Sequence, residues 1–182
     1  ANVKNPWFTK KMIHHSLSVW SDQITPENID NWLNSYSIPN HSSSKSILLI
    51  LAGNLPMVGW HDFICCYLLG FKVKIKLSKS DDVIIPFMIK ILSLFSIDLV
   101  KETEIVKGKA KDYDMVIATG SNNTNRYFEY YFGKTPHLFR KNRTSVAIID
   151  NQTTENDLNN LSKDVFDYFG LGCRSVTKLY IE

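Results

Sequence analysis

One short apolar run limits the folds open to this chain more than any other feature. Residues 47–51 read Ile-Leu-Leu-Ile-Leu, and Gly53 follows closely after them. An uninterrupted apolar stretch of this length is typical of a central parallel strand, because such a strand is buried on both of its faces. The run therefore predicts the middle of a parallel sheet.

The residues after this run alternate between strand and helix patterns. Short apolar or alternating runs predict strands, and amphipathic segments between them predict helices. The expected strands are 73–77, 115–118, 145–149 and 176–181, and the expected helices are 60–69, 80–95, 120–131 and 154–169. Two helices precede the sheet, one capped by Thr9 and one beginning at Thr25-Pro26. The pattern predicts an α/β fold with a parallel sheet and helices on both faces.

The composition of the 182 residues fits a globular domain and excludes several other classes. A hydrophobic fraction of 44% is too high for a disordered segment, and no apolar stretch approaches the roughly 20 residues of a bilayer span. A net charge of +3 is too small to indicate nucleic-acid binding. Since the three cysteines include no CxxC pair and no signal peptide opens the chain, we expect a reduced, cytoplasmic setting.

Two of the expected strands end in segments that could bind a ligand. Gly53-Asn54 follows the first strand, and Gly120-Ser121 follows the strand at 115–118. Ligands gather beyond the carboxyl ends of strands in open α/β sheets, and a Gly-Ser turn that opens a helix offers N–H groups to a phosphate. The alternatives are that Asn54 completes a turn and that Ser121 only caps a helix. The dinucleotide fingerprint GxGxxG is absent.

The cysteines divide into two kinds. Cys173 lies in a glycine-containing loop between a helix and a strand, beside Arg174, which would favour a thiolate. The alternative is that Cys173 is a small buried hydrophobe. Cys65 and Cys66 lie in an apolar helix and are expected to be buried.

Clusters of charge complete the set of candidates. Lysines at positions 72, 74, 76 and 79 form a stripe that either faces solvent or lies where a cofactor ribose would bind. Arg140, Lys141 and Arg143 are expected in a solvated loop, with phosphate binding as the alternative. His61-Asp62 has no partner at a recognisable metal spacing, so no metal site is expected.

Taken in order, three loops resemble those of the aldehyde dehydrogenase superfamily: Ala-Gly-Asn-Leu-Pro at 52–56, Ala-Thr-Gly-Ser-Asn-Asn-Thr at 118–124, and Gly-Leu-Gly-Cys at 170–173. Within it, the chain is most similar to acyl-CoA reductases related to the fatty-acid reductase component of bacterial bioluminescence. The segments that carry this closer likeness are Gly-Trp-His-Asp-Phe at 59–63, Arg-Tyr-Phe-Glu-Tyr-Tyr-Phe-Gly-Lys at 126–134, and Arg-Lys-Asn-Arg at 140–143. The resemblance extends from about Asn5 to the end.

The resemblance assigns catalytic roles to two residues and nicotinamide contacts to two more. Cys173 falls on the nucleophile of the family, and Asn54 on the asparagine whose amide helps form the oxyanion hole. Gly120 and Ser121 match the Gly-Ser pair that borders the nicotinamide. Each role is an expectation that the likeness implies.

A further element of the resemblance concerns the adenosine ribose. Lys76 and Ser78 match a Lys-Pro-Ser element that holds this ribose, with Leu77 in place of the proline. Lys79 lies where NAD-preferring relatives often carry an acidic residue, which implies NADPH as cofactor, with NADH as the alternative. Asp81 and Asp82, close by in the sequence, argue against that preference.

One departure from the family bears on the reaction. Hydrolytic aldehyde dehydrogenases carry a glutamate before a Gly-Gly pair as the base for deacylation, whereas residues 140–143 here contain no carboxylate. Reduction of an acyl group needs no such base. The resemblance therefore implies NADPH-dependent reduction of a long-chain acyl-CoA to the aldehyde, through a thioester on Cys173.

The resemblance also implies how the chain is organised. Residues 1–45 would form a helical segment, 46–170 the cofactor-binding domain, and 171–182 the nucleophile loop and the start of a truncated catalytic domain. The chain begins without Met and stops inside an expected strand, so we expect a fragment of a larger enzyme that forms a homo-oligomer or receives acyl groups from a partner enzyme. The alternatives are a non-catalytic nucleotide-binding module and a reductase of acyl phosphates.

Overall fold

The computed structural model describes residues 1–38 and 44–182, which form two compact units, Ala1–Arg140 and Lys141–Glu182. Most of the polar connection expected at 39–46 lies outside the described residues. The expected cofactor-binding segment, 46–170, runs across the boundary between the units, and its functional extent stays a prediction.

The first unit is built on a five-stranded parallel sheet. Its strands lie in the order β3 (Thr103–Ile105), β2 (Lys72–Lys76), β1 (Ser46–Ile50), β4 (Met115–Thr119) and β5 (His137–Arg140). The register places Ile47 between Val73 of β2 and Met115 of β4. The prediction of a parallel sheet with the 47–51 run at its centre is thus confirmed.

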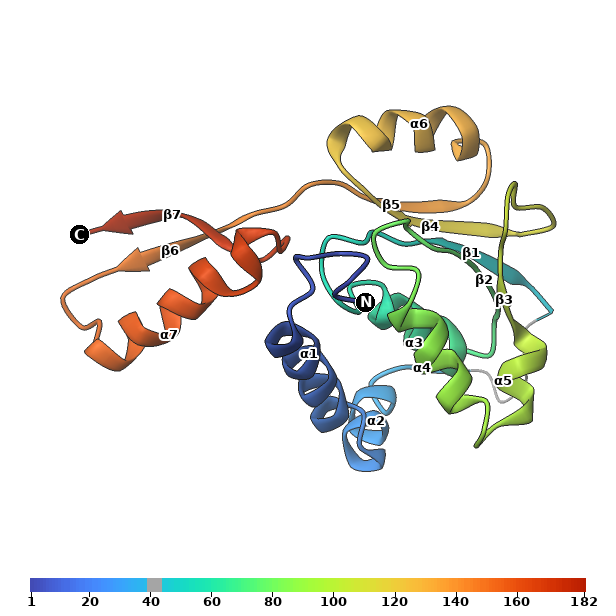
Figure 1. The fold of residues 1–182 in the computed structure, drawn as a ribbon, viewed down its shortest axis with the longest axis horizontal. Helices are drawn as coiled ribbons and strands as arrows, with labels where there is room; N and C mark the ends of the chain where they lie inside the picture. Colours follow the sequence, from blue (N-terminus) through green and yellow to red (C-terminus); the bar gives the residue numbers. More distant parts are fainter. Residues whose placement is uncertain (39–43) are drawn as a thin grey trace. The chain divides into compact units, whose positions relative to one another are not determined.

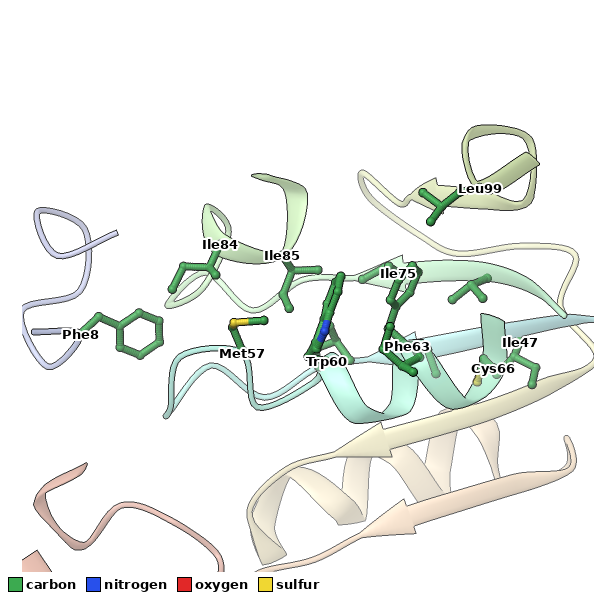
Figure 2. Close-up of a cluster of buried hydrophobic side chains, with 14 residues drawn as sticks. Phe8, Ile47, Met57, Trp60, Phe63, Cys66, Ile75, Ile84, Ile85 and Leu99 are labelled. Atoms are coloured by element: carbon green, nitrogen blue, oxygen red, sulfur yellow. The ribbon is translucent and has the colours of Figure 1, made fainter. Parts of the chain in front are cut away.

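Helices cover both faces of this sheet (Figure 1). The helices α3 (Trp60–Leu68), α4 (Ile84–Leu92) and α5 (Ile97–Glu102) lie on one face, and α6 (Asn122–Phe132) lies on the other. Alternate residues of β1 serve the two faces, because Ile47 and Leu49 pack in the cluster with α3 and α4 while Leu48 packs with Phe128 of α6. Figure 2 shows the larger cluster, in which Trp60 and Phe63 are fully buried.

Two helices precede the sheet, as the capping residues predicted. Thr9 caps α1 (Lys10–Gln23), accepting the Met12 N–H at 3.3 Å, and Thr25 caps α2 (Pro26–Leu33) in the same way. The apolar side chains Ile13, Leu17 and Trp20 of α1 pack against the larger cluster. A side-chain oxygen at the cap satisfies an N–H group that the first helical turn leaves unpaired.

The second unit is a single β-α-β element. Strand β6 (Ser145–Ile149) pairs in parallel with β7 (Val176–Ile181), and α7 (Glu155–Phe166) connects them. Thr154 and Asp157 form a capping box at the start of α7. Both strands and the helix were expected.

The structure corrects several boundaries. The helix expected at 80–95 begins at Ile84, because the Asp81 carboxylate accepts the Ile84 N–H at 3.3 Å and the residues before it form a turn. The helix expected at 154–169 ends at Phe166, and a 3-10 turn, η1 (Asp167–Gly170), follows with Tyr168 and Phe169 at positive φ. Sequence reasoning missed α5, β3 and β5, which have six, three and four residues and are too short to show a clear period.

Candidate functional site

The expected ligand loops of the first unit meet at one edge of the sheet. Strands β2 and β3 lie to one side of β1, and β4 and β5 lie to the other, so the strand order reverses between β1 and β4. In open α/β sheets this reversal leaves a crevice beyond the carboxyl ends of the two strands. Because β1 and β4 run parallel, Asn54, after β1, and Gly120-Ser121, after β4, follow strand ends at that same edge.

The loop after β1 packs closely against the loop after β2. A Cβ atom on Gly53 would lie 2.6 Å from Ser78 Oγ and 3.1 Å from the Asp81 amide nitrogen, which is far too close for a side chain. Gly53 is buried, whereas the next residue, Asn54, is exposed. The absence of a side chain at Gly53 thus lets the two loops approach each other beside Asn54.

The loop after β2 holds the residues expected at the adenosine ribose. The Lys76 ammonium group donates to the Gly108 carbonyl, and Ser78 Oγ accepts the Ser80 N–H at 3.2 Å. Lys79 is exposed. Lys74 Nζ donates to the Lys111 carbonyl at 2.9 Å, so the lysine stripe is partly covered rather than wholly solvated.

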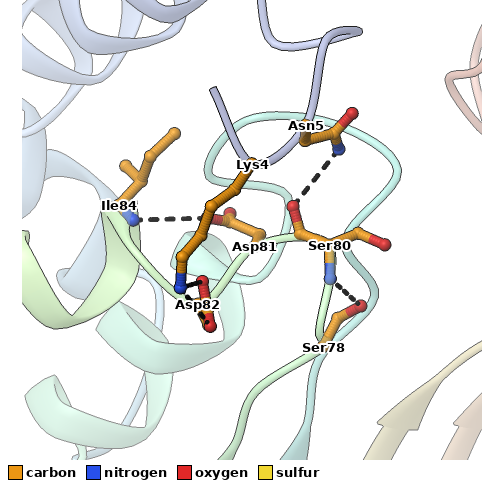
Figure 3. A network of polar contacts seen from close by, with 7 residues as sticks. All are labelled: Lys4, Asn5, Ser78, Ser80, Asp81, Asp82 and Ile84. Carbon is orange, nitrogen blue, oxygen red and sulfur yellow. Dashed lines mark hydrogen bonds and ion pairs between the residues drawn. The ribbon is translucent and has the colours of Figure 1, made fainter. Parts of the chain in front are cut away.

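The acidic residues of this loop are held by other groups (Figure 3). Asp81 is buried, and burial raises the pKa of its carboxyl although the Ile84, Met57 and Val83 N–H groups oppose this shift. The Asp82 carboxylate forms an ion pair with Lys4 Nζ at 2.8 Å, a hydrogen bond that lowers the pKa of Asp82.

The N-terminal segment supports the same loop. Asn5 Nδ2 donates to the Ser80 carbonyl at 3.2 Å, while the neighbouring Lys4 holds Asp82 (Figure 3). Asn5 is buried, so this contact links the first residues of the chain to the loop after β2. Nothing in the sequence pattern indicated that link.

The turn after β4 is a well-formed helix cap. Ser121 Oγ accepts the Thr124 N–H at 3.1 Å, and a Cβ atom on Gly120 would lie 3.0 Å from the Thr124 side chain. The helix-capping interpretation of Ser121 therefore holds in structure. It is compatible with cofactor binding, because the first turn of a helix presents N–H groups whichever side chain caps it.

Arg140 corrects the expectation of a solvated basic loop. It ends β5, and its guanidinium forms an ion pair with Asp62 in the first turn of α3. The Asp62 side chain is only 7% exposed and that of Arg140 is 30% exposed. Lys141 and Arg143, which begin the second unit, are exposed as expected. The sequence signal for this ion pair was the Asp62 carboxylate within an apolar helix, since buried charges require partners.

The three cysteines differ in burial. Cys66 is buried in α3, and this burial, with the nearby Asp62 charge, raises the pKa of its thiol to about 12. Cys65 was also expected to be buried but is only half-buried, and this partial burial raises the pKa of its thiol. Cys173 is exposed, so the alternative of a buried hydrophobe is wrong.

Cys173 lies at the tip of a tight turn in the second unit. The Ser175 N–H donates to the Gly172 carbonyl at 3.1 Å, and the Gly172 N–H donates to Ser175 Oγ at 3.1 Å. These two bonds close the turn around Cys173 and Arg174 and leave both side chains exposed. Asn54 belongs to the other compact unit, so the expected pairing of Asn54 with Cys173 stays a prediction.

Residues 1–38 and 44–182 contain neither a cluster of metal ligands nor a helix that could cross a membrane. No three His, Cys, Asp or Glu side chains gather there closely enough to hold a metal ion. The helices in these ranges are too short or too polar to cross a bilayer.

Comparison with known proteins connects this chain to one fold. No protein-family model and no curated protein matches it. Solved structures do: an aldehyde dehydrogenase from Bartonella henselae has a TM-score of 0.66 at 16% identity, covering 82% of this chain and 36% of its own. A Bacillus cereus aldehyde dehydrogenase, solved with NAD⁺, has a TM-score of 0.61 at 18% identity over 79% of this chain and 32% of its own.

A third neighbour is a variant of aldehyde dehydrogenase C from Pseudomonas syringae, solved with NAD⁺ and octanal. Its TM-score is 0.63 at 15% identity, over 77% of this chain and 32% of its own. The chain thus spans about a third of the length of these neighbours. Together with the strand order, the comparisons identify an aldehyde-dehydrogenase-like α/β fold, with a parallel sheet flanked by helices.

Proposed function

We propose that this chain belongs to a nicotinamide-dependent oxidoreductase that reduces a long-chain acyl-CoA to the aldehyde. The observation that carries the proposal is the convergence of the Asn54, Ser78 and Gly120-Ser121 loops at one sheet edge of an aldehyde-dehydrogenase-like fold. An exposed cysteine on a tight turn, Cys173, supplies the nucleophile.

The residues at the sheet edge fit a dinucleotide. Gly120 and Ser121 would border the nicotinamide, with Lys76 and Ser78 at the adenosine ribose. Bacillus cereus and Pseudomonas syringae neighbours were solved with NAD⁺, which supports a nicotinamide cofactor here. When bound, this cofactor supplies a hydride.

The surroundings of Lys79 favour NADPH over NADH. Lys79 is exposed, while Asp81 is buried and accepts the Ile84 N–H, and Asp82 is paired with Lys4. The two acids that argued against a phosphate-binding cation in the sequence are therefore engaged by other groups. A 2′-phosphate would gain a charge-assisted contact from Lys79.

The protein residues would act in two steps. The Cys173 thiolate attacks the thioester carbonyl, the carbon–sulfur bond to CoA breaks, and CoA leaves as a thiol after taking up a proton. The Asn54 amide donates to the oxyanion that forms during this attack. With the hydride that a bound cofactor would supply, the Cys173 thioester would be reduced to a thiohemiacetal, whose carbon–sulfur bond would break to release the aldehyde and the Cys173 thiolate.

The environment of Arg140 favours reduction over hydrolysis. Residues 140–143 would occupy the position of the deacylating base, and Arg140 is engaged with the buried Asp62 carboxylate. Residues 140–143 contain no carboxylate of their own that could activate water. The acyl group would therefore leave Cys173 as aldehyde, in a reducing compartment such as the cytoplasm.

A second candidate, a nucleotide-binding module without turnover, is favoured by one observation. The chain covers about a third of the length of its structural neighbours, so the acyl site would have to be completed by other segments. A homo-oligomer or an acyl-transfer partner enzyme could supply them.

Turnover measured with two acyl donors distinguishes an acyl-CoA reductase from an acyl-phosphate reductase and from a nucleotide-binding module. The chain is mixed with NADPH and either an acyl-CoA or the corresponding acyl phosphate, and loss of nicotinamide absorbance is compared with aldehyde formed. With acyl-CoA, we expect the amount of NADPH consumed to equal the amount of aldehyde formed. Asn54→Ala should lower the turnover rate by roughly 100- to 1000-fold and leave the cofactor affinity unchanged. Turnover with acyl phosphate alone would contradict the acyl-CoA assignment, and cofactor binding with neither donor consumed would favour the module.

A further inference from the structure

A buried amide ties the turn after β4 to the end of β5. Asn125, in the first turns of α6, is 2% exposed, and its Nδ2 group lies 3.3 Å from the Gly120 carbonyl oxygen, 3.1 Å from that of Ser121 and 3.3 Å from that of Arg140. The Gly120 N–H also donates to the Arg140 carbonyl, at 3.1 Å. One side chain thus connects three carbonyl groups from two loops.

Arg140 is fixed from the other face of the sheet as well. Its backbone carbonyl accepts from Asn125 of α6, while its side chain is paired with Asp62 of α3. Helices α6 and α3 lie on opposite faces (Figure 1). The end of β5 is therefore a fixed support against which Asn125 holds the Gly120-Ser121 turn.

The amide is unfavourable as core packing alone. Asn125 Oδ1 is buried and has no hydrogen-bond partner among the described residues. A buried unpaired acceptor lowers stability, whereas an apolar residue, such as the neighbouring buried Phe128, has no such penalty. The benefit of Asn125 must therefore come from the three groups that its N–H atoms contact.

Planarity of the peptide group gives this contact a consequence for a ligand. In a trans peptide the C=O and N–H bonds point in opposite directions, and the chain has no cis peptides in its described residues. Since the Gly120 and Ser121 carbonyls point toward Asn125, the N–H groups of the next residues, Ser121 and Asn122, point away from it. Two successive N–H groups that point in the same direction can both donate hydrogen bonds to one anionic group.

We propose that Asn125 is a positioning residue that sets the direction of the Ser121 and Asn122 N–H groups for the phosphates of a nicotinamide dinucleotide. The inference rests on the proposed function, because it takes the Gly120-Ser121 turn as a cofactor contact. Asn125 itself does not touch the cofactor; it acts through the peptide groups that it holds.

Two substitutions test this role against simple packing. Asn125→Ala removes the donors together with the unpaired oxygen, and it leaves only the Gly120 carbonyl without a partner, because the Ser121 and Arg140 carbonyls keep backbone donors. Asn125→Asp keeps the shape but turns an acceptor toward three carbonyls. The control Asn123→Asp adds the same charge on the exposed side of the same turn.

The measurements are the cofactor dissociation constant and amide hydrogen exchange at Gly120 and Ser121, each on the whole chain. We expect Asn125→Ala to keep its unfolding midpoint but to weaken NADPH binding by roughly tenfold and to speed exchange at Gly120. Asn125→Asp should weaken binding more at pH 8 than at pH 5, because the protonated acid can donate one hydrogen bond. Asn123→Asp should show the same rates of amide hydrogen exchange at Gly120 and Ser121 as the parent.

Each other outcome is also decisive. Unchanged binding and exchange in both Asn125 variants, or equal effects in Asn123→Asp, would overturn the positioning role. If Asn125→Asp does not fold, Asn125→Ala decides alone. If the parent chain binds no dinucleotide, the proposed function fails, and faster Gly120 exchange in Asn125→Ala still tests whether Asn125 orients the turn.

Discussion

The carboxylate of Asp62, in the first turn of α3, forms an ion pair with the guanidinium of Arg140 at the carboxyl end of β5. This pair joins residues 78 positions apart and fixes the last residue of the first compact unit. It also removes the positive charge of Arg140 from the set of groups available to a phosphate.

Removing one partner of this pair should destabilise the first unit. Arg140→Ala leaves Asp62 as a buried charge without its partner, so we expect a loss approaching about 3–5 kcal/mol, reduced by the partial exposure of Arg140. The double variant Asp62→Leu/Arg140→Met should recover most of the unfolding free energy lost in Arg140→Ala, because no unpaired charge remains. Urea unfolding of the three proteins checks this. Equal stability of Arg140→Ala and the parent would show that the pair contributes nothing.

Contact between the loops after β1 and β2 should make Gly53 intolerant of a side chain. A Cβ atom there would meet Ser78 Oγ at 2.6 Å and Ser78 Cβ at 2.7 Å, so Gly53→Ala should lose about 1–3 kcal/mol of unfolding free energy. Adding Ser78→Gly removes both atoms and should restore part of that loss. A double-mutant cycle measures the coupling, and strict additivity would mean that the loops do not press on each other.

Burial of Asp81 should make the free energy of unfolding depend on pH. Because the pKa of Asp81 is raised in the folded state, the folded protein binds this proton over a range where the unfolded chain has lost it. Stability due to Asp81 therefore falls as pH rises from the ordinary aspartate pKa through the raised value. Asp81→Asn should lack this fall. Subtracting the stability–pH curves of variant and parent isolates the effect, and a flat difference would contradict it.

The exposed Lys79 should govern the choice between the two nicotinamide cofactors. We expect Lys79→Ala to weaken NADPH binding by roughly ten- to a hundredfold and to leave NADH binding nearly unchanged, because only NADPH carries the 2′-phosphate. The matched control is Lys134→Ala, an exposed lysine just beyond α6. Calorimetric titration measures both affinities. Equal losses of affinity for NADPH and NADH would show that Lys79 does not contact the 2′-phosphate.

Much of the fold could be predicted because its signals are local. The apolar 47–51 run identified the central strand, and the residues after β1, β2 and β4 identified the sheet edge at which the loops meet. The Asp62–Arg140 pair and the three contacts of Asn125 could not be predicted, because they join side chains and carbonyls whose meeting depends on the packed fold. Short elements such as β3 also gave no readable period.

Acyl transfer to Cys173 can be detected in the intact mass of the chain after incubation with a long-chain acyl-CoA and no reductant. We predict one acyl adduct on the parent and on Cys65→Ser, and none on Cys173→Ser, because Cys173 is exposed while burial raises the pKa of Cys65 and Cys66. An adduct that persists in Cys173→Ser, or no adduct on a chain whose Cys173 is readily alkylated by iodoacetamide, would contradict acyl transfer through this residue.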